Sequence, residues 1–171
     1  MDFITGLPFS QGKYCIFVAV DCLTKYTHFF AIPSKISSSQ IAEIFFQGVF
    51  RLHGLPKTIV SDHDSRFMGA FWQDLFRLAG IELTPSTSYH PQTDGQTEAL
   101  NKWVEGYLRD YVTRQQRAWT KWLYLGEYFY NTTYHMSIGM SHFQALYGYE
   151  ALSFADTTFR DSRSPSAKDW I

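Results

Sequence analysis

Cysteine is scarce in this sequence. Only Cys15 and Cys22 occur among 171 residues, and neither belongs to a C-x-x-C pair. Two cysteines are too few for a disulfide framework, so we expect buried, reduced thiols and exclude the disulfide-rich class of small domain. His90 has no Cys or His partners at the spacing that zinc ligands require, which argues against a zinc role for it.

Long apolar runs and an excess of one charge are also missing. No apolar stretch approaches the roughly 18–20 residues of a membrane span, and no secretory leader pattern is present, so we expect no membrane partner. The formal net charge is -1. A neutral chain has no overall positive field for nucleic acid. Contacts with nucleic acid would therefore come from local patches or from other parts of a larger protein.

Aromatic residues make up 18% of the chain and hydrophobic residues 45%, enough for the core of one domain. Apolar runs of strand length and helical periodicity alternate along the sequence, which predicts an α/β sandwich with a mixed sheet. Strands are expected near residues 2–4, 14–20, 26–32, 57–61 and 81–84. Helices are expected near residues 40–53, 70–79, 96–115, 119–134 and 141–147, with a polar loop at 86–95 and a more polar tail from 151.

Local signals support several of these elements. The runs at 14–20 and 26–32 flank a short polar turn and predict an antiparallel hairpin. The serines at 37–39 offer N-caps for the first helix, and Gly54 lies at its expected end. These assignments rest on neighbouring residues alone.

Four acids lie at strand ends or at a helix start: Asp2, Asp21, Asp62 and Glu98. Hard cations such as Mg²⁺ take carboxylate oxygens, and a pair of such ions can clamp both oxygens of a phosphoryl transfer. Asp21, Asp62 and Glu98 also have a structural explanation, because aspartates are common in turns and a helix dipole favours an acid in its first turn. The 35 residues between Asp62 and Glu98 are enough to bring a strand end and a helix start to one edge of a sheet.

The segments around these acids resemble the catalytic cores of retroviral and retrotransposon integrases. These segments are most similar to those of Ty3/gypsy elements, plant elements in particular, and the resemblance runs from Asp2 to about Glu150. The matching segments are MDFITGLP, FRLHGLPKTIVSD, SDHDSRF, YHPQTDGQTEALN, WLYLGEYFYNTTYH and GMSHFQALYG. The resemblance implies an RNase H-like α/β fold with a five-stranded mixed sheet flanked by helices. It places the core at residues 1–150 and a tail, the start of a linker, at 151–171.

The resemblance also implies the catalytic triad. In the family the first catalytic aspartate lies in the segment that corresponds to MDFITGLP, which favours Asp2 over Asp21, the acid at the end of the most obvious strand. Asp2, Asp62 and Glu98 would then hold two Mg²⁺ ions, with Mn²⁺ as a substitute. The implied reaction trims the 3′ ends of the element's DNA and joins them to target DNA by one-step transesterification.

Supporting roles follow from the same likeness. Tyr89 and Gln92 would approach the DNA end from the loop 86–95, Asn101 would support the site, and Lys102 would meet a DNA phosphate. A solvated helix position explains Lys102 equally well. Asp64 is expected to close its turn, and His63 replaces the usual arginine. Base stacking is conceivable for the aromatics of the last two long helices, but their helical spacing favours core packing or a subunit interface.

The implied partners are double-stranded DNA, from the element and from the target, and further copies of the chain. The implied location is the nucleus, with a cytoplasmic phase. Two rivals remain: a ribonuclease H or transposase on the same fold, and a catalytically impaired fragment or host-retained domain for DNA binding or assembly.

Some positions depart from the family. Ala99 is smaller than usual, Tyr124 and His142 stand where many relatives have proline, and Gly126 stands where alanine is usual. A complete integrase of this type would also carry a zinc-binding domain upstream and a DNA-binding domain downstream, and neither fits within this chain. The first strand is expected to be cut short at Met1, which would hold Asp2 less firmly.

Overall fold

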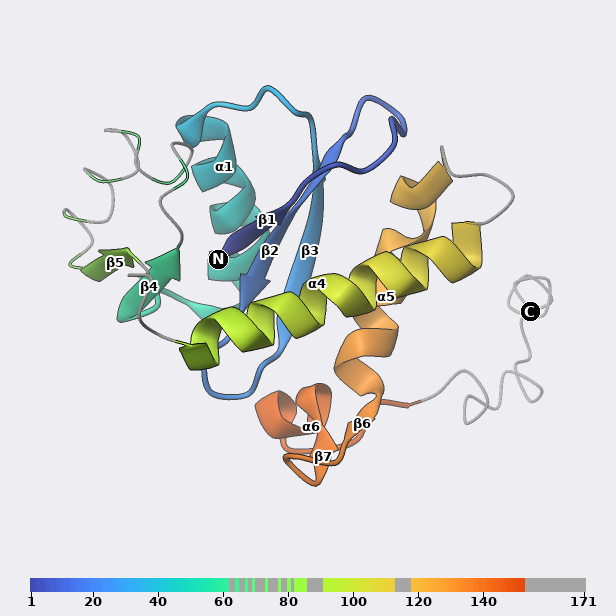
Figure 1. Ribbon diagram of the computed structural model, residues 1–171. Helices are drawn as coiled ribbons and strands as arrows, with labels where there is room; N and C mark the ends of the chain where they lie inside the picture. Colours follow the sequence, from blue (N-terminus) through green and yellow to red (C-terminus); the bar gives the residue numbers. More distant parts are fainter. Residues whose placement is uncertain are drawn as a thin grey trace, which may run out of the picture.

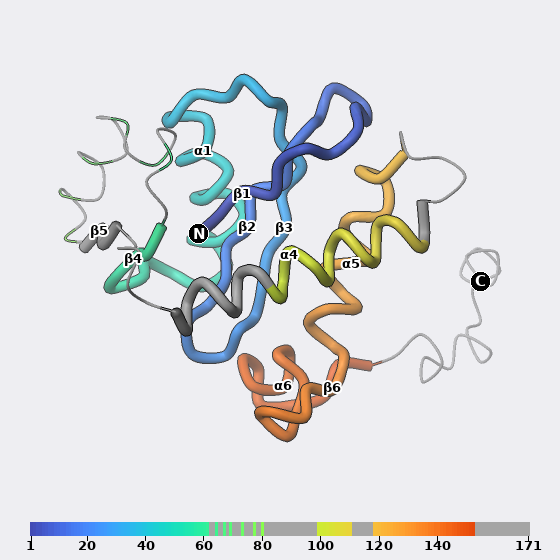
Figure 2. Tube along the Cα trace, in the orientation of Figure 1, coloured from blue at the N-terminus to red at the C-terminus, as the bar shows by residue number. Residues whose placement is uncertain are grey.

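The computed structural model describes three long stretches of the chain, residues 1–61, 91–112 and 118–152, plus the strand at 82–85. Six further single residues are described: Asp64, Phe67, Gly69, Gln73, Arg77 and Gly80. For residues 82–85, 91–98, 111 and 112 only the backbone is described. Figure 2 draws the remaining residues in grey; they include most of the predicted helix at 70–79 and the tail from 153.

Three antiparallel strands form the central sheet in the order β1-β2-β3, with β1 Asp2–Ile4, β2 Cys15–Val20 and β3 Thr27–Ile32. The register pairs Asp2 with Val18, and Val18 in turn with Phe29. The predicted hairpin is confirmed. β2 is buried along nearly its whole length, as its uninterrupted run of apolar residues indicates.

β4 Thr58–Ser61 and β5 Glu82–Pro85 form a separate, parallel pair. The expected single five-stranded sheet is therefore seen as two sheets, one of three strands and one of two, in the described part of the chain. The physical reason lies in β1, whose three residues offer only a short edge for β4 to pair with. A hydrogen bond from the Met1 ammonium group to the Val60 carbonyl oxygen, at 2.6 Å, joins the two sheets.

A continuous helical run covers one face of the central sheet and consists of α1 Ser38–Phe45, η1 Phe46–Phe50 and α2 Arg51–His53. It begins two residues earlier than expected because Ser37 and Gln40 form a capping box. The middle turn is a π-helix, a local widening that the sequence did not predict. Gly54 ends the run with a positive φ of 79°, as expected of a glycine in that position.

The long helix α4 Pro91–Val112 crosses the other face of the sheet (Figure 1). Its predicted start at residue 96 was wrong by five residues, and the loop predicted at 86–95 ends earlier than expected. Pro91 takes the first helical position, where the missing N–H leaves no hydrogen bond unmade and the fixed φ suits a helix. Gln92, expected in a loop, therefore lies in the first turn of α4.

The chain returns in α5 Trp119–Thr132, which packs along β3 and against α4. It ends two residues before the expected position, and a short hairpin follows, β6 Tyr134–His135 and β7 Met140–Ser141. The helix α6 His142–Tyr147 completes the described fold, with Ser141 as its N-cap. No helix among the described residues is long and apolar enough to cross a membrane.

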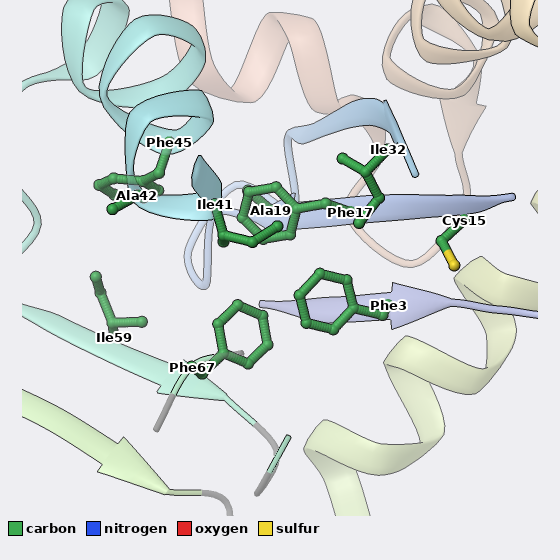
Figure 3. Packing of buried hydrophobic residues seen from close by; sticks show 10 residues of the cluster. All are labelled: Phe3, Cys15, Phe17, Ala19, Ile32, Ile41, Ala42, Phe45, Ile59 and Phe67. Atoms are coloured by element: carbon green, nitrogen blue, oxygen red, sulfur yellow. The ribbon is translucent and has the colours of Figure 1, made fainter. Parts of the chain in front are cut away.

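Two hydrophobic cores lie on opposite faces of the central sheet. Phe3 and Phe17 point toward the α1 side, where Phe67 stacks on Phe3 with ring centroids 4.5 Å apart (Figure 3). Val18 and Phe29 face α4 and α5, whose contributions to this second core include Leu100. Because side chains alternate along a strand, Asp2 shares the face of its partner Val18 and points toward α4.

Gly126 lets α5 approach α4 closely, and we expect its replacement by alanine to be destabilising. A Cβ atom at this position would come within 2.8 Å of the Tyr107 ring. That ring cannot withdraw easily, because it stacks on Trp103 and its hydroxyl donates to the Trp122 carbonyl oxygen. Overpacking costs about 1–3 kcal/mol, against a helix-propensity gain of about 1 kcal/mol, so Gly126→Ala should lower the free energy of unfolding by about 1 kcal/mol.

The matched control is Gly106→Ala in α4. A Cβ there meets nothing closer than an Arg109 guanidinium nitrogen at 3.9 Å, so only the propensity gain remains. Urea unfolding of both variants should move the midpoints in opposite directions. A Gly126→Ala variant that is more stable than the wild type would show that the Tyr107 ring can shift without a loss of stability.

Candidate active site

Asp2 begins β1 and points toward α4, and it is the one member of the predicted triad whose side chain is described. One carboxylate oxygen, Oδ1, accepts a hydrogen bond from the Phe3 backbone N–H at 2.7 Å. The other, Oδ2, accepts from the Asn101 side-chain amide at 3.3 Å. Asp2 is half-buried at the start of β1.

Asn101 lies on α4, and its side chain forms the contact between this helix and Asp2. Its Nδ2 atom is the donor, since a carboxylate can only accept. Its Oδ1 atom is buried and has no hydrogen-bond partner among the described residues. An amide oxygen in this state is an acceptor that a cation or a water molecule would satisfy.

The backbone of α4 also places Glu98 relative to Asp2. Glu98 precedes Asn101 by three residues in the same helix, so the two positions lie on one face about 4.5 Å apart along the axis. The Asn101–Asp2 contact therefore brings the Glu98 position within one helical turn of the Asp2 carboxylate. The Glu98 side chain itself lies outside the described residues.

The third predicted acid, Asp62, lies outside the described residues, but it directly follows the end of β4. The hydrogen bond from Met1 to Val60 brings this strand end next to the start of β1. The start of β1 thus contacts both the end of β4 and the first half of α4, the three segments that carry or border the predicted acids.

The donor set at this point fits a hard divalent cation. The Asp2 carboxylate and the Asn101 amide oxygen are both oxygen donors, which Mg²⁺ prefers. No group of three His, Cys, Asp or Glu side chains with metal-ligand spacing occurs in the part of the chain that the structure describes. That part excludes the side chains of Asp62 and Glu98, so a complete triad cannot appear in it.

Asp21, the alternative first acid, is tied into the β2–β3 turn. Its Oδ2 atom accepts hydrogen bonds from both the backbone N–H and the hydroxyl group of Thr24, each at 2.7 Å. Partial burial raises the pKa of Asp21, but these hydrogen bonds outweigh it and hold the pKa below the usual value. The local geometry accounts for this aspartate without a metal ion.

The structure describes only some of the other predicted residues. Lys102 is exposed on α4, next to Asn101. Gln92 is described only as backbone in the first turn of α4, and Tyr89 and His63 lie outside the described residues. Asp64 accepts a backbone hydrogen bond from Phe67 through its carbonyl oxygen, at 2.9 Å, as expected of a residue within a turn.

Comparison with known proteins identifies the family. The model of the family described as "Integrase core domain" matches residues 1–91, more than half of the chain. The chain belongs to the integrase core domain family. The matched region contains Asp2 and Asp62 and ends before Glu98.

Curated relatives extend the likeness of this integrase core over nearly the whole chain. The Tf2-3 and Tf2-4 transposon polyproteins of Schizosaccharomyces pombe, of the Ty3/gypsy type, are each 34% identical in an alignment of 170 residues that covers 95% of this chain. The chain spans only 13% of the length of these polyproteins.

Solved structures share the fold of this integrase core. The HTLV-2 integrase catalytic core domain, solved with magnesium in a trimeric form, has a TM-score of 0.67 at 17% identity and covers 84% of this chain and 93% of its own. The simian T-cell lymphotropic virus intasome, solved with a regulatory subunit of PP2A, has a TM-score of 0.71 at 14% identity. The match covers 89% of this chain and 55% of the intasome chain. The expected integrase-type α/β fold is thereby confirmed.

A hollow of about 870 Å³ lies elsewhere in this integrase core, beside β3 between η1 and α5. Its lining includes Phe29, Gln47 and Tyr124, and none of the predicted site residues. The hollow is therefore separate from the predicted carboxylate site.

Sequence reasoning missed a polar network at the outer edge of the sheet. The Nδ1 atom of His28 lies 2.9 Å from a Glu127 carboxylate oxygen, and its Nε2 atom lies 2.9 Å from Nε2 of His53. Burial lowers the pKa of His53, and the neighbouring His28 lowers it further, while Asp21 acts in the opposite direction. No local signal could have revealed these contacts, because their partners are 25 and 99 residues apart.

His142 is buried at the first position of α6, and we expect it to make the stability of the domain depend on pH. Burial, followed by the nearby His135, lowers the pKa of His142 to about 4, although a hydrogen bond to the Thr24 carbonyl oxygen opposes this. An unfolded histidine titrates near 6.5, so the unfolded state binds the proton first as pH falls. The free energy of unfolding should therefore drop by about 2–3 kcal/mol between pH 7 and 4.5 on account of this group.

His142→Pro tests this assignment, because proline suits the first position of a helix. The variant should match the wild type to within about 1 kcal/mol at pH 7. It should lose the His142 share of the pH dependence. Urea unfolding at pH 7 and 4.5 measures both quantities, and an unchanged difference between the two pH values would assign the dependence to other groups.

Proposed function

We propose that this chain is the catalytic core of a Ty3/gypsy-type retrotransposon integrase that joins the element's DNA to target DNA. The contact between Asp2 and Asn101 is the main support for the proposal, because Asn101 lies three residues after Glu98 in the same helix, α4. Family membership and the integrase fold are independent support. The chain spans 13% of the length of the polyproteins that it resembles, so the proposal concerns the integrase core alone.

The proposed site consists of Asp2, Asp62 and Glu98, which would hold two Mg²⁺ ions, or Mn²⁺ as a substitute. When bound, such ions supply the positive charge that stabilises both the attacking and the leaving oxygen of an in-line displacement. Three carboxylates give enough negative charge and enough oxygen ligands for this pair of cations.

Asn101, predicted as a DNA-binding residue that supports the site, is also proposed to hold the Asp2 carboxylate in place from α4. Its Nδ2 atom already donates to Asp2 Oδ2, and this bond fixes the carboxylate together with the one from Phe3 N–H. Lys102 is proposed to meet a DNA phosphate, since it is exposed next to Asn101. Tyr89 and Gln92 are proposed to contact the DNA end near the N-terminus of α4.

The reaction needs no covalent enzyme intermediate. In end trimming, a water oxygen bonds to phosphorus and gives up a proton, while the bond between phosphorus and the 3′ oxygen breaks and that oxygen leaves as a hydroxyl group. In strand transfer, the 3′-hydroxyl oxygen of the element bonds to a target phosphorus, and the target's own 3′ oxygen leaves with a proton. The protein's task is to position the reacting groups and the charges that stabilise them.

The proposed partners are double-stranded DNA and further copies of the chain, and the proposed location is the nucleus, with a cytoplasmic phase. Homologous viral cores were solved in trimeric and dimeric forms, which supports self-association here. The proposed core extends over residues 1–150 and the tail over 151–171. We also propose that β1 and β4 pair further to complete the five-stranded mixed sheet, building on the bond from Met1 to Val60.

The test is strand transfer with a donor DNA end and a labelled target, for this chain and for a chain extended upstream of Met1. Activity should require Mg²⁺ or Mn²⁺ and should be absent with Ca²⁺ or EDTA. Cleavage of an RNA–DNA hybrid without joining of DNA ends would support the ribonuclease H alternative instead. Self-association without divalent-metal binding in either chain would support an assembly domain and contradict the proposal.

A further inference from the structure

The outer edge of the central sheet carries two histidines whose ring nitrogens converge. His28 extends from β3 and is only 8% exposed, whereas His53 is the exposed last residue of α2. Their Nε2 atoms lie 2.9 Å apart. Behind them, Glu127 of α5 approaches Nδ1 of His28 with one oxygen and accepts from the Phe29 backbone N–H with the other, at 2.9 and 2.8 Å.

These contacts determine which nitrogens carry protons. A carboxylate accepts hydrogen bonds, so His28 must donate to Glu127 through Nδ1. In the neutral ring, His28 Nε2 is then left with a lone pair directed at His53. The contact between the two Nε2 atoms contains a single proton, and His53 supplies it. Because His53 is exposed, its proton can instead reside on Nδ1, which then donates a hydrogen bond to water. This tautomer leaves a lone pair on Nε2 of His53 as well.

A carboxylate behind a histidine is the arrangement that orients metal-binding imidazoles in proteins. We propose that His28 and His53 form a binding site for a borderline divalent transition metal such as Zn²⁺, oriented by Glu127. In this site the cation replaces the proton shared by the two Nε2 atoms. Each ring contributes one lone pair, and water molecules occupy the remaining coordination positions.

The distances allow this replacement. Zinc–nitrogen bonds of about 2.0–2.1 Å place two ligands of a tetrahedral ion about 3.3 Å apart. The present separation of 2.9 Å must therefore increase by about half an ångström. The exposed His53 side chain can provide this movement, while Glu127 holds His28 in place. Bound metal would tie α2 to β3, and through Glu127 to α5.

The proposed site is distinct from the carboxylate site. Asp2, Val18 and Phe29 are cross-strand neighbours and share the face of the sheet that α4 covers. His28 precedes Phe29, so its side chain points to the opposite face. The two sites also prefer different ions, because nitrogen ligands favour zinc and its neighbours whereas oxygen ligands favour Mg²⁺.

The experiment uses the full chain without an affinity tag, treated with EDTA and dialysed into excess MgCl2. Calorimetric titration with ZnCl2 should reveal one site per chain, and saturating Zn²⁺ should raise Tm by about 5 °C. Addition of Zn²⁺ should shift the ring NMR signals of His28 and His53. Glu127→Gln should weaken binding by about 10- to 100-fold, as expected for loss of the group that orients a ligand.

His53→Gln is the decisive variant, since it removes an exposed ligand at a helix end with little effect on the fold. It should abolish both the heat signal and the shift in Tm. His135→Gln is the matched control, because His135 belongs to another histidine pair, with His142, and should leave Zn²⁺ binding unchanged. The proposal is overturned if wild-type chain binds no Zn²⁺, or if His53→Gln binds it as well as the wild type.

Discussion

Asp2→Asn and Glu98→Gln are each expected to lower Mg²⁺-dependent strand transfer by at least about 10³-fold. Both changes remove one negative charge with almost no change in side-chain shape, so the loss should reflect the weaker hold on the cations. Asn at position 2 keeps an oxygen that can accept from Phe3 N–H, and rotation of the Asn101 amide can restore the second bond. The fold should therefore persist, as measured by an unchanged urea midpoint.

Asp21→Asn is the matched control for this prediction. Asp21 is bonded to Thr24 within an exposed turn, so its neutralisation should alter strand transfer by less than about threefold. Calorimetric titration with Mg²⁺ or Mn²⁺ gives a second measurement that does not depend on turnover. Equal losses in Asp21→Asn and Asp2→Asn, in rate and in metal binding, would exclude the assignment of Asp2 as the first acid.

The largest expected effect on stability is at Asn131, a residue of α5 that is only 1% exposed. Its side-chain oxygen accepts from the Thr27 backbone N–H at 2.9 Å, and its nitrogen donates to the Thr27 carbonyl oxygen at 2.8 Å. The amide thus takes the place of a neighbouring strand at the start of β3. Asn131→Leu would leave both backbone groups buried and unpaired, which should lower the free energy of unfolding by about 3–5 kcal/mol.

Two variants sharpen this prediction. Asn131→Asp keeps the acceptor but replaces the donor with an oxygen that repels the Thr27 carbonyl, so it should cost nearly as much as leucine. Thr133→Ala removes an exposed hydrogen bond to the Phe129 carbonyl oxygen and should change stability by less than about 0.5 kcal/mol. Urea unfolding gives these energies, and amide exchange at Thr27 should accelerate only in the Asn131 variants. A fully stable Asn131→Leu would show that water replaces both bonds.

Much of the fold follows from short-range patterns. The run of apolar residues in β2 and the polar turn after it predict the hairpin with β3, and both are present. Gly54 was predicted to end the first helix, and it does so in the structure. The wrong start predicted for α4 also has a local cause. A proline such as Pro91 is compatible with both a loop and a first helical turn, so the sequence near it does not decide between them.

The candidate site could be predicted only in part. The spacing of Asp62 and Glu98 and the motifs around them indicated an integrase, and family comparison confirmed it. The choice between Asp2 and Asp21 could not be made from local sequence, since both lie at strand ends. The contact of Asp2 with Asn101 and the bonds of Asp21 to Thr24 favour Asp2, and strand transfer by the variants tests that preference.

The sequence by itself determined strands β1 to β5, most helix ends to within about two residues, and the integrase family, because these depend on patterns within a few residues or on motifs that the chain carries intact. It did not predict the hairpin of β6 and β7. Tertiary structure decided the features that depend on distant partners. Asn131 meets Thr27 across 104 residues, and Met1 reaches Val60 across 59. Burial leaves such polar groups no water to bond with, so they pair wherever the folded chain brings a partner close. Only the packed structure determines which partner that is.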